Sequence, residues 1–393
     1  MSSGGNAAVK RPGLRVRPFL VFWHRWFGIL AALWLGLMGI TGSAVVYYEE
    51  IDSWLNSDLR RVEMVGEPAE PGAWIEAAKQ AYPDRYVRFI DLPDEPGKTV
   101  RIAMPPTSDD HAPSYEVYVD PYTATVLGHR QHDVVSLHPR YLMNFLYELH
   151  LDLHLGPLMM WFLGLVSLLW IVDHLAAAVL SFPVLKKWMA SFRIRLGAGG
   201  HKATFDVHRA GGLWMWPVTL ALAVSGLYFN WYEGFTKTVD AVSPITPRAI
   251  FTLEALDEPV LDPRISFPEA FEIGRQGDAS LTYDMATYNP RLAAYEMRAY
   301  DPRDIDGYGR RMIVVGGQDG ALLSDRHSTE GSAGDVFLAW QYPLHSGKAF
   351  GAIGRFIIFV SGIVLTVLCV TGIMIWLRKR SARRHRKTKA IQA

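Results

Sequence analysis

The sequence has almost no cysteine, since only one of its 393 residues, Cys369, is of this type. A single thiol cannot form a disulfide within the chain, and it excludes a CxxCH site for covalently attached haem and any four-cysteine metal site. The chain also lacks an HExxH motif and a Ser-His-Asp constellation, so nothing in it indicates a hydrolase. Any domain outside a membrane must therefore be held together by its own apolar core.

The chain also has almost no net charge, with 40 Lys+Arg against 39 Asp+Glu. The charges are nevertheless segregated. Residues 1–25, 181–209 and 377–393 together contain 19 Lys or Arg and a single acid, Asp206, so they carry +18 and leave −17 on the rest of the chain. This segregation excludes an ordinary soluble globular protein and indicates that a barrier separates the two charge populations.

Four long apolar segments accompany the basic ones, and each can cross the ~30 Å hydrocarbon core of a bilayer as a helix of about 20 residues. The first follows basic residues, as a signal peptide does, but it is too long for one and has no convincing cleavage site. With four spans all basic segments lie on one side, which the positive-inside rule identifies as the cytoplasm. The predicted spans are residues 20–48, 148–180, 206–232 and 344–377, and the cytoplasmic segments are residues 1–19, 181–205 and 378–393.

Two long connections, residues 49–147 and 233–343, belong to the acidic remainder and are predicted to face outward. Each contains a short helical pattern followed by segments in which apolar and polar residues alternate, as in β-strands with one buried face. The sequence thus predicts an integral membrane α-helical protein. Its fold would be a four-helix transmembrane bundle with two extracytoplasmic α+β domains.

The two halves of the chain repeat each other. The dipeptide His-Arg at 24–25 recurs at 208–209, an offset of 184 residues, and the dipeptide Leu-His at 149–150 recurs at 344–345, an offset of 195 residues. Each half therefore consists of an outward helix, an outer domain and a returning helix. This order indicates an internal two-fold repeat.

The repeat places four histidines in two matched pairs. His24 and His208 lie near the cytoplasmic ends of the first and third spans, and His150 and His345 lie near the outer ends of the other two. Imidazole is a strong axial ligand of haem iron, and facing helices of a bundle can supply both ligands. Gly28 lies one turn after His24 on the same face, where it leaves room for a porphyrin. We therefore predict two haems b, one near each face of the membrane.

Two further histidines are candidate ligands. His154 lies one turn beyond His150 on the same helical face and is an alternative ligand for the outer haem. His174 lies deep in the second span beside Asp173, and it is a third candidate for the inner haem or a proton carrier, because ionisable groups inside a membrane are often functional. A lone histidine at a membrane interface is more often a structural polar anchor. The pairing is what favours ligation.

Several motifs along the chain form a recognisable set. They are Trp23–Gly28, Gly39–Gly42, Leu149-His150, His208–Gly212, Leu344–Gly347 and Val370–Leu377. As a set they resemble the helical signatures of PepSY-associated transmembrane proteins, also called iron-regulated membrane proteins, over nearly the whole chain. Val119–Gly128 resembles the closing hairpin of a PepSY domain, whereas the second outer domain has Gly316-Gly317-Gln318 where an Asp-containing turn is usual.

The resemblance implies a multi-pass protein of the bacterial inner membrane, with both termini cytoplasmic and two periplasmic domains. Some members of the family are haem-b reductases that release iron from ferric siderophores in the periplasm. The family's motif histidines correspond to His24, His150, His208 and His345, and His154 falls where an aliphatic residue is more usual. The expected activity is that of an oxidoreductase in iron uptake, a ferric-siderophore reductase. Reduction to Fe(II) weakens binding by hard oxygen ligands.

The electron donor is expected to be a separate molecule. The cytoplasmic segments are too short for a flavin or nicotinamide domain, and no Gly-rich dinucleotide fingerprint opens a helix in them. The expected partners are a ferric siderophore, membrane lipid, and a cytoplasmic reductase or quinol as donor, and no nucleic acid is expected.

A function of a different class is also compatible with the outer domains. The helices could anchor PepSY domains that bind or regulate a periplasmic peptidase or another protein, without redox activity. This alternative leaves the paired histidines unexplained.

Overall fold

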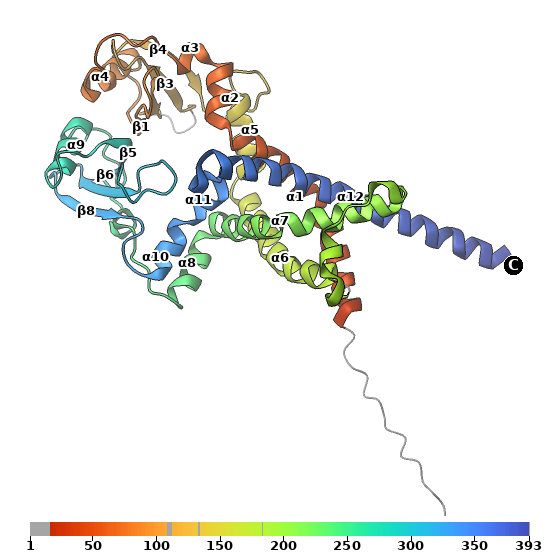
Figure 1. Ribbon diagram of the computed structural model, residues 1–393. Helices are drawn as coiled ribbons and strands as arrows, with labels where there is room; N and C mark the ends of the chain where they lie inside the picture. The colour runs from red at the N-terminus through yellow and green to blue at the C-terminus, as the bar shows by residue number, and fades with distance from the viewer. Residues whose placement is uncertain (1–15, 108–111, 133, 183, 393) are drawn as a thin grey trace, which may run out of the picture. The chain divides into compact units, whose positions relative to one another are not determined.

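The structure, a computed structural model, describes residues 16–107, 112–132, 134–182 and 184–392. Most of the predicted N-terminal cytoplasmic segment, residues 1–15, lies outside the described residues. Among the described residues, four helices are long and apolar enough to cross a membrane (Figure 1). They are α1 (Val16–Val45), α6 (Pro157–Ser181), α7 (Gly200–Asn230) and α12 (Gly351–Gln392).

These helices expose large apolar side chains. Leu30 and Leu33 of α1 are 72% and 68% exposed, and Leu158 of α6 is 79% exposed. Such surfaces are unfavourable in water, whereas lipid chains solvate them well. The exposed leucines therefore agree with helices that lie in a bilayer.

The chain forms two compact units. The first comprises Met1–Ile40, Gly164–Gly226 and Ser361–Ala393, and the second comprises Thr41–Leu163 and Leu227–Val360. In the first unit the long helices approach closely where their residues are small. A Cβ on Gly39 of α1 would lie 2.6 Å from the carbonyl oxygen of Gly362 of α12. Close packing at small residues is a principal source of helix association in membranes.

Two long connections make up most of the second unit. Between α1 and α6 its elements are α2 (Tyr48–Leu55), α3 (Ser57–Arg60), α4 (Pro71–Ala81), β1 (Phe89–Asp91), β2 (Val100–Met104), β3 (Tyr115–Val119), β4 (Val126–Gln131) and α5 (Leu142–Leu151). Between α7 and α12 they are α8 (Tyr232–Asp240), η3 (Ala249–Thr252), α9 (Phe267–Arg275), β5 (Tyr283–Asn289), β6 (Ala294–Ala299), β7 (Arg311–Gly316), β8 (Leu322–His327), α10 (Ala333–Ala339), α11 (Gln341–Ser346) and η4 (Lys348–Phe350). In the first unit, η1 (Leu185–Phe192) and η2 (Leu196–Ala198) lie between α6 and α7.

The strands of both connections form one antiparallel sheet in the order β4-β3-β2-β1-β5-β6-β7-β8. The connections meet where β1 pairs with β5, with Ile90 opposite Ala286. The sequence predicts two separate outer domains, and the structure instead joins their strands in a single sheet. The physical reason is that each four-stranded half has an edge strand whose backbone groups the other half can satisfy.

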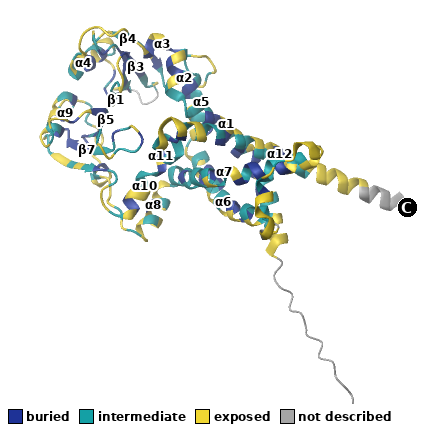
Figure 2. Ribbon diagram, viewed as in Figure 1, coloured by how far each residue is buried: buried dark blue, intermediate teal, exposed yellow. Residues whose placement is uncertain are grey.

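Helices α4 and α9 pack on the joined sheet. Trp74 of α4 and Phe267 and Phe271 of α9 are at most 6% exposed and belong to one apolar cluster with residues of the strands. Figure 2 shows buried segments in dark blue among the strands of this sheet. A capping box starts α9, in which the Ser266 hydroxyl accepts from the Glu269 N–H and the Glu269 carboxylate accepts from the Ser266 N–H. This apolar core stabilises the connections without a disulfide.

Candidate functional site

In the first unit, His24 of α1 lies opposite His208 of α7. Their ring centroids are 6.1 Å apart and their planes are inclined at 58°. An imidazole nitrogen binds a transition metal at about 2.0–2.1 Å and lies ~1 Å from its own ring centroid, so two rings on opposite sides of one ion have centroids about 6 Å apart. The spacing of this pair therefore fits one metal ion between the two rings.

Both rings of the first pair are held at their Nδ1 atoms. The Nδ1 of His24 lies 2.9 Å from a carboxylate oxygen of Asp173 on α6. The Nδ1 of His208 lies 3.0 Å from the carbonyl oxygen of Leu368 and 3.1 Å from the hydroxyl of Thr371, both on α12. Within the described chain, all hydrogen bonds of these two rings are at Nδ1. Such bonds fix the tautomer and orientation of the ring and leave Nε2 to bind a metal.

Glycine provides space beside the first pair. At Gly28, one turn after His24, no described atom beyond its chain neighbours and its own helix backbone lies within 4 Å of the position that a Cβ would take. At its repeat counterpart, Gly212, the nearest atom is a flexible side-chain carbon of Leu368 at 3.8 Å. A flat macrocycle held between helices requires such positions without side chains.

In the second unit, His150 of α5 lies opposite His345 of α11. Their ring centroids are 6.2 Å apart and their planes are inclined at 58°. The Nδ1 of His150 lies 3.1 Å from the hydroxyl of Thr41 on α1. A Cβ on Gly42 would lie 2.8 Å from the Cε1 of His150, so any larger residue there would displace the ring. The second pair therefore repeats the spacing of the first.

The second pair lies on short helices that precede the long ones. The sequence places His150 and His345 within the spans 148–180 and 344–377, whereas α6 begins at Pro157 and α12 begins at Gly351. The chain turns at Gly156 and Gly347, whose φ angles of 71° and 76° favour glycine. Because of these turns, α5 and α11 do not continue the direction of the long helices that follow them.

Two imidazoles alone are an incomplete ligand set for a metal ion. Among the described residues, no group of three or more His, Cys, Asp or Glu side chains is arranged to hold a metal. Haem iron in proteins is held by side-chain ligands such as imidazole, and each pair would offer two of them. The residues present therefore fit haem better than a bare ion.

The other two candidate ligands have different partners. The Nε2 of His154 lies 3.0 Å from the carbonyl oxygen of Phe145, and its ring stacks on the ring of Phe145. The two ring nitrogens of His174 lie 2.8 Å from the carbonyl oxygen of Trp170 and 3.0 Å from the hydroxyl of Thr219. His174 would have to give up a hydrogen bond in order to bind iron, whereas the hydrogen bond of the His154 ring engages only its Nε2.

Three side chains form hydrogen bonds with the paired rings that the sequence does not predict: Asp173, Thr41 and Thr371. Asp173 is the only acidic residue of α6, and an isolated acid in an apolar span is a signal for a specific partner. Thr41 and Thr371 each precede a glycine, and these small-residue pairs are a second signal.

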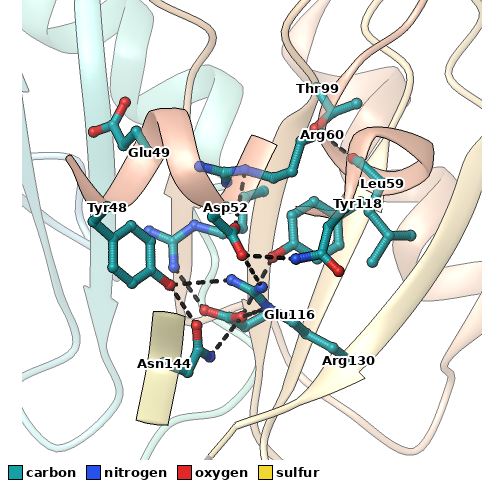
Figure 3. Close-up of polar contacts among 12 residues, drawn as sticks. Tyr48, Glu49, Asp52, Leu59, Arg60, Thr99, Glu116, Tyr118, Arg130 and Asn144 are labelled. Atoms are coloured by element: carbon teal, nitrogen blue, oxygen red, sulfur yellow. Dashed lines mark hydrogen bonds and ion pairs between the residues drawn. The ribbon is translucent and has the colours of Figure 1, made fainter. Parts of the chain in front are cut away.

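A buried polar network positions the helix that carries His150 (Figure 3). Arg130 of β4 donates to the carboxylate of Asp52 on α2 at 2.8 Å and also to Glu116 of β3. Asn144 of α5 donates to Glu116 at 3.3 Å. The network thus links α5 to the sheet and to α2.

Two arginines act on the pKa of Glu116 in this network. Burial alone would raise the pKa of Glu116, but the charges of Arg101 and Arg130 hold it well below its usual range. A buried carboxylate and guanidinium stabilise each other only while both are present, so the loss of either leaves an uncompensated charge.

Glu49 of α2 forms a further ion pair in this unit. Its carboxylate accepts from the ammonium of Lys98 at 2.7 Å. Burial alone would raise the pKa of Glu49, but the charge and hydrogen bond of Lys98 lower it from 4.5 to about 2. Because the folded pKa is the lower one, the pair stabilises the fold fully above pH 4.5, and its contribution is lost as the pH falls towards 2.

We therefore expect Lys98→Met to lower the midpoint of thermal unfolding at neutral pH. The difference from wild type should shrink as the pH falls from 4.5 towards 2. The measurement is thermal unfolding of the full chain in detergent at several pH values. Lys79→Met, which changes an exposed lysine on α4, serves as the matched control. A difference between wild type and Lys98→Met that is independent of pH would contradict the assignment.

Comparison with known families gives a match over most of the chain. A sequence model described as "PepSY-associated TM region" matches residues 21–379, which include both histidine pairs. No curated protein matches the chain.

Proposed function

Since the chain belongs to the family of PepSY-associated transmembrane proteins, we propose that it is a haem-b-containing reductase that passes electrons outward to a ferric siderophore. The observation that carries the proposal is the presence of two facing histidine pairs with nearly equal ring separations, 6.1 and 6.2 Å. A membrane anchor for a binding domain has no need of such pairs.

The chain's own residues have defined roles in this proposal. His24 and His208 would hold an inner haem, and His150 and His345 an outer haem. When bound, haem with two axial imidazoles supplies a one-electron carrier. The hydrogen bonds at Nδ1 would orient the imidazoles. Each haem would be held by one residue from each half of the chain, as an internal two-fold repeat predicts.

The proposed location is the bacterial inner membrane, with both termini in the cytoplasm and the joined sheet in the periplasm. The segregated charge supports this orientation, because the basic segments carry +18 and the remainder −17. The acidic remainder would favour cationic or neutral ferric complexes over anionic ones.

The proposed reaction transfers one electron to Fe(III), which becomes Fe(II). A lower-charged iron ion binds hard oxygen ligands less well, so the siderophore releases it. The electron would come from a cytoplasmic reductase or from quinol.

The proposal can be tested with a ferric trihydroxamate as the probe. Purified full-length protein is reduced with dithionite without oxygen, freed of excess reductant and mixed with the complex. We expect the haem spectrum to return to the oxidised form while a ferrous-iron chelator develops colour in equal amount. Haem that stays reduced in the presence of the ferric complex would refute the proposed activity.

A further inference from the structure

The rings of the two pairs differ in the chemistry of the groups at Nδ1. His24 faces a carboxylate, and both oxygens of Asp173 lie within 3.1 Å of its Nδ1. At His208 the groups beside Nδ1 are neutral, a carbonyl and a hydroxyl, and the hydroxyl of Thr41 lies beside Nδ1 of His150. The first pair thus has a potential negative charge beside one of its rings, that of His24.

The charge of Asp173 is not compensated by an arginine or lysine. The residue is 5% exposed, and in the described part of the chain its only ion pair is with His24. Asp206 of α7 is also buried, but Arg195 and Arg209 lie 2.7 and 3.1 Å from its carboxylate. An uncompensated carboxylate in an apolar span is unfavourable unless it has a specific task.

The next residue along α1 does not compensate the charge either. The guanidinium of Arg25 lies over the rings of Phe22 and Trp26, at 5.8 and 5.4 Å from their centroids. This placement turns the cation towards its own helix. The field of the Asp173 carboxylate at the histidine pair is therefore not cancelled by this neighbour.

A carboxylate that accepts a hydrogen bond from the Nδ1–H group makes the imidazole a stronger electron donor to the metal that it binds. The same negative charge lies near the iron, where it stabilises the ferric state relative to the ferrous state, because the ferric state has the greater positive charge. Both effects lower the reduction potential of the haem that His24 holds.

We propose that Asp173 is a positioning residue that lowers the potential of the inner haem and so makes that haem a stronger donor of the electron that passes outward. The inference rests on the proposed function. In the step concerned, ferrous iron at the inner pair loses one electron and ferric iron at the outer pair gains it, and no bond or proton is exchanged. The electron itself comes from the reductase or quinol donor.

The test is a potentiometric titration of the full-length protein in detergent, followed by the visible spectrum. In Asp173→Asn the amide oxygen can still accept a hydrogen bond from the Nδ1–H group, but the side chain lacks the charge. We expect the inner haem to be easier to reduce, with at least a tenfold change in its ratio of reduced to oxidised forms, or about 59 mV for one electron. The outer haem is identified by its loss in His345→Ala, and its potential should stay unchanged.

Two further variants keep the test decisive if Asp173→Asn does not retain the inner haem. Thr371→Val removes only a neutral partner of His208 and should move the inner potential much less. Thr41→Asp places a carboxylate beside the Nδ1 of His150 and should lower the potential of the outer haem, in the direction opposite to the first change.

The outcomes separate this inference from the function on which it rests. A wild-type protein without haem would overturn both. If the protein contains two haems and Asp173→Asn leaves the inner potential unchanged, only the role of Asp173 is overturned. If Asp173→Asn lacks the inner haem, an unchanged outer potential in Thr41→Asp has the same consequence.

Discussion

Replacing His24 by alanine is expected to remove one of the two haems and to leave the other in place. The variant lacks one of the two rings that face each other at 6.1 Å, so the iron would lose an axial ligand. His345→Ala should have the same effect on the second pair, where the rings are 6.2 Å apart. Each variant should therefore contain about half of the wild-type haem, because each pair would hold one. The measurement is haem per polypeptide, by pyridine haemochrome, on the purified protein.

His201→Ala is the matched control for this experiment. His201 is exposed near the start of α7, and its loss should leave the haem content at the wild-type level. His174→Ala adds a discriminating case, because both ring nitrogens of His174 are engaged in hydrogen bonds and it should retain both haems. Loss of both haems from either His24→Ala or His345→Ala would contradict two independent sites.

Replacing Arg130 by alanine is expected to destabilise the protein by about 3–5 kcal/mol, the usual effect of breaking a buried ion pair. Arg130 is 1% exposed, and its partners Asp52 and Glu116 are 0% and 3% exposed. The variant leaves two buried carboxylates without their shared cation. Because Asn144 joins α5 to this network, the same change should weaken retention of the outer haem. Thermal unfolding in detergent and haem content together measure the two effects.

Arg140→Ala provides the comparison for the Arg130 variant. Arg140 pairs with Asp58, but the two side chains are 31% and 62% exposed. Such a solvated pair contributes only about 0–1 kcal/mol. Similar losses of stability from Arg130→Ala and Arg140→Ala would show that the buried network does not position α5.

The long helices and the strands could be predicted from the sequence, and their arrangement only in part. Hydropathy alone identifies α1, because it is a single apolar segment with basic residues before it. The alternation of apolar and polar residues identifies strands such as β2. The junction between the two halves of the sheet leaves no such signal, since β1 (Phe89–Asp91), which pairs with β5, is a strand of only three residues. Edge pairing is decided by backbone groups, which every sequence has.

The histidine pairs themselves follow from the internal repeat, because a shared offset predicts a shared depth in the membrane. The side chains around them do not follow from it. Asp173 is 149 residues from His24, and their contact depends on how far α6 is rotated about its axis relative to α1. The positions of His150 and His345 likewise depend on helix breaks, at Gly156 and Gly347, that a hydropathy profile does not register.

The most direct test of the account is the visible spectrum and haem content of the purified wild-type protein, expressed with adequate haem supply. We predict a Soret band, a low-spin spectrum typical of two axial imidazoles, and two haems b per chain. A protein that contains no haem under these conditions would contradict the central claim, because the two facing histidine pairs would then lack the cofactor that explains them.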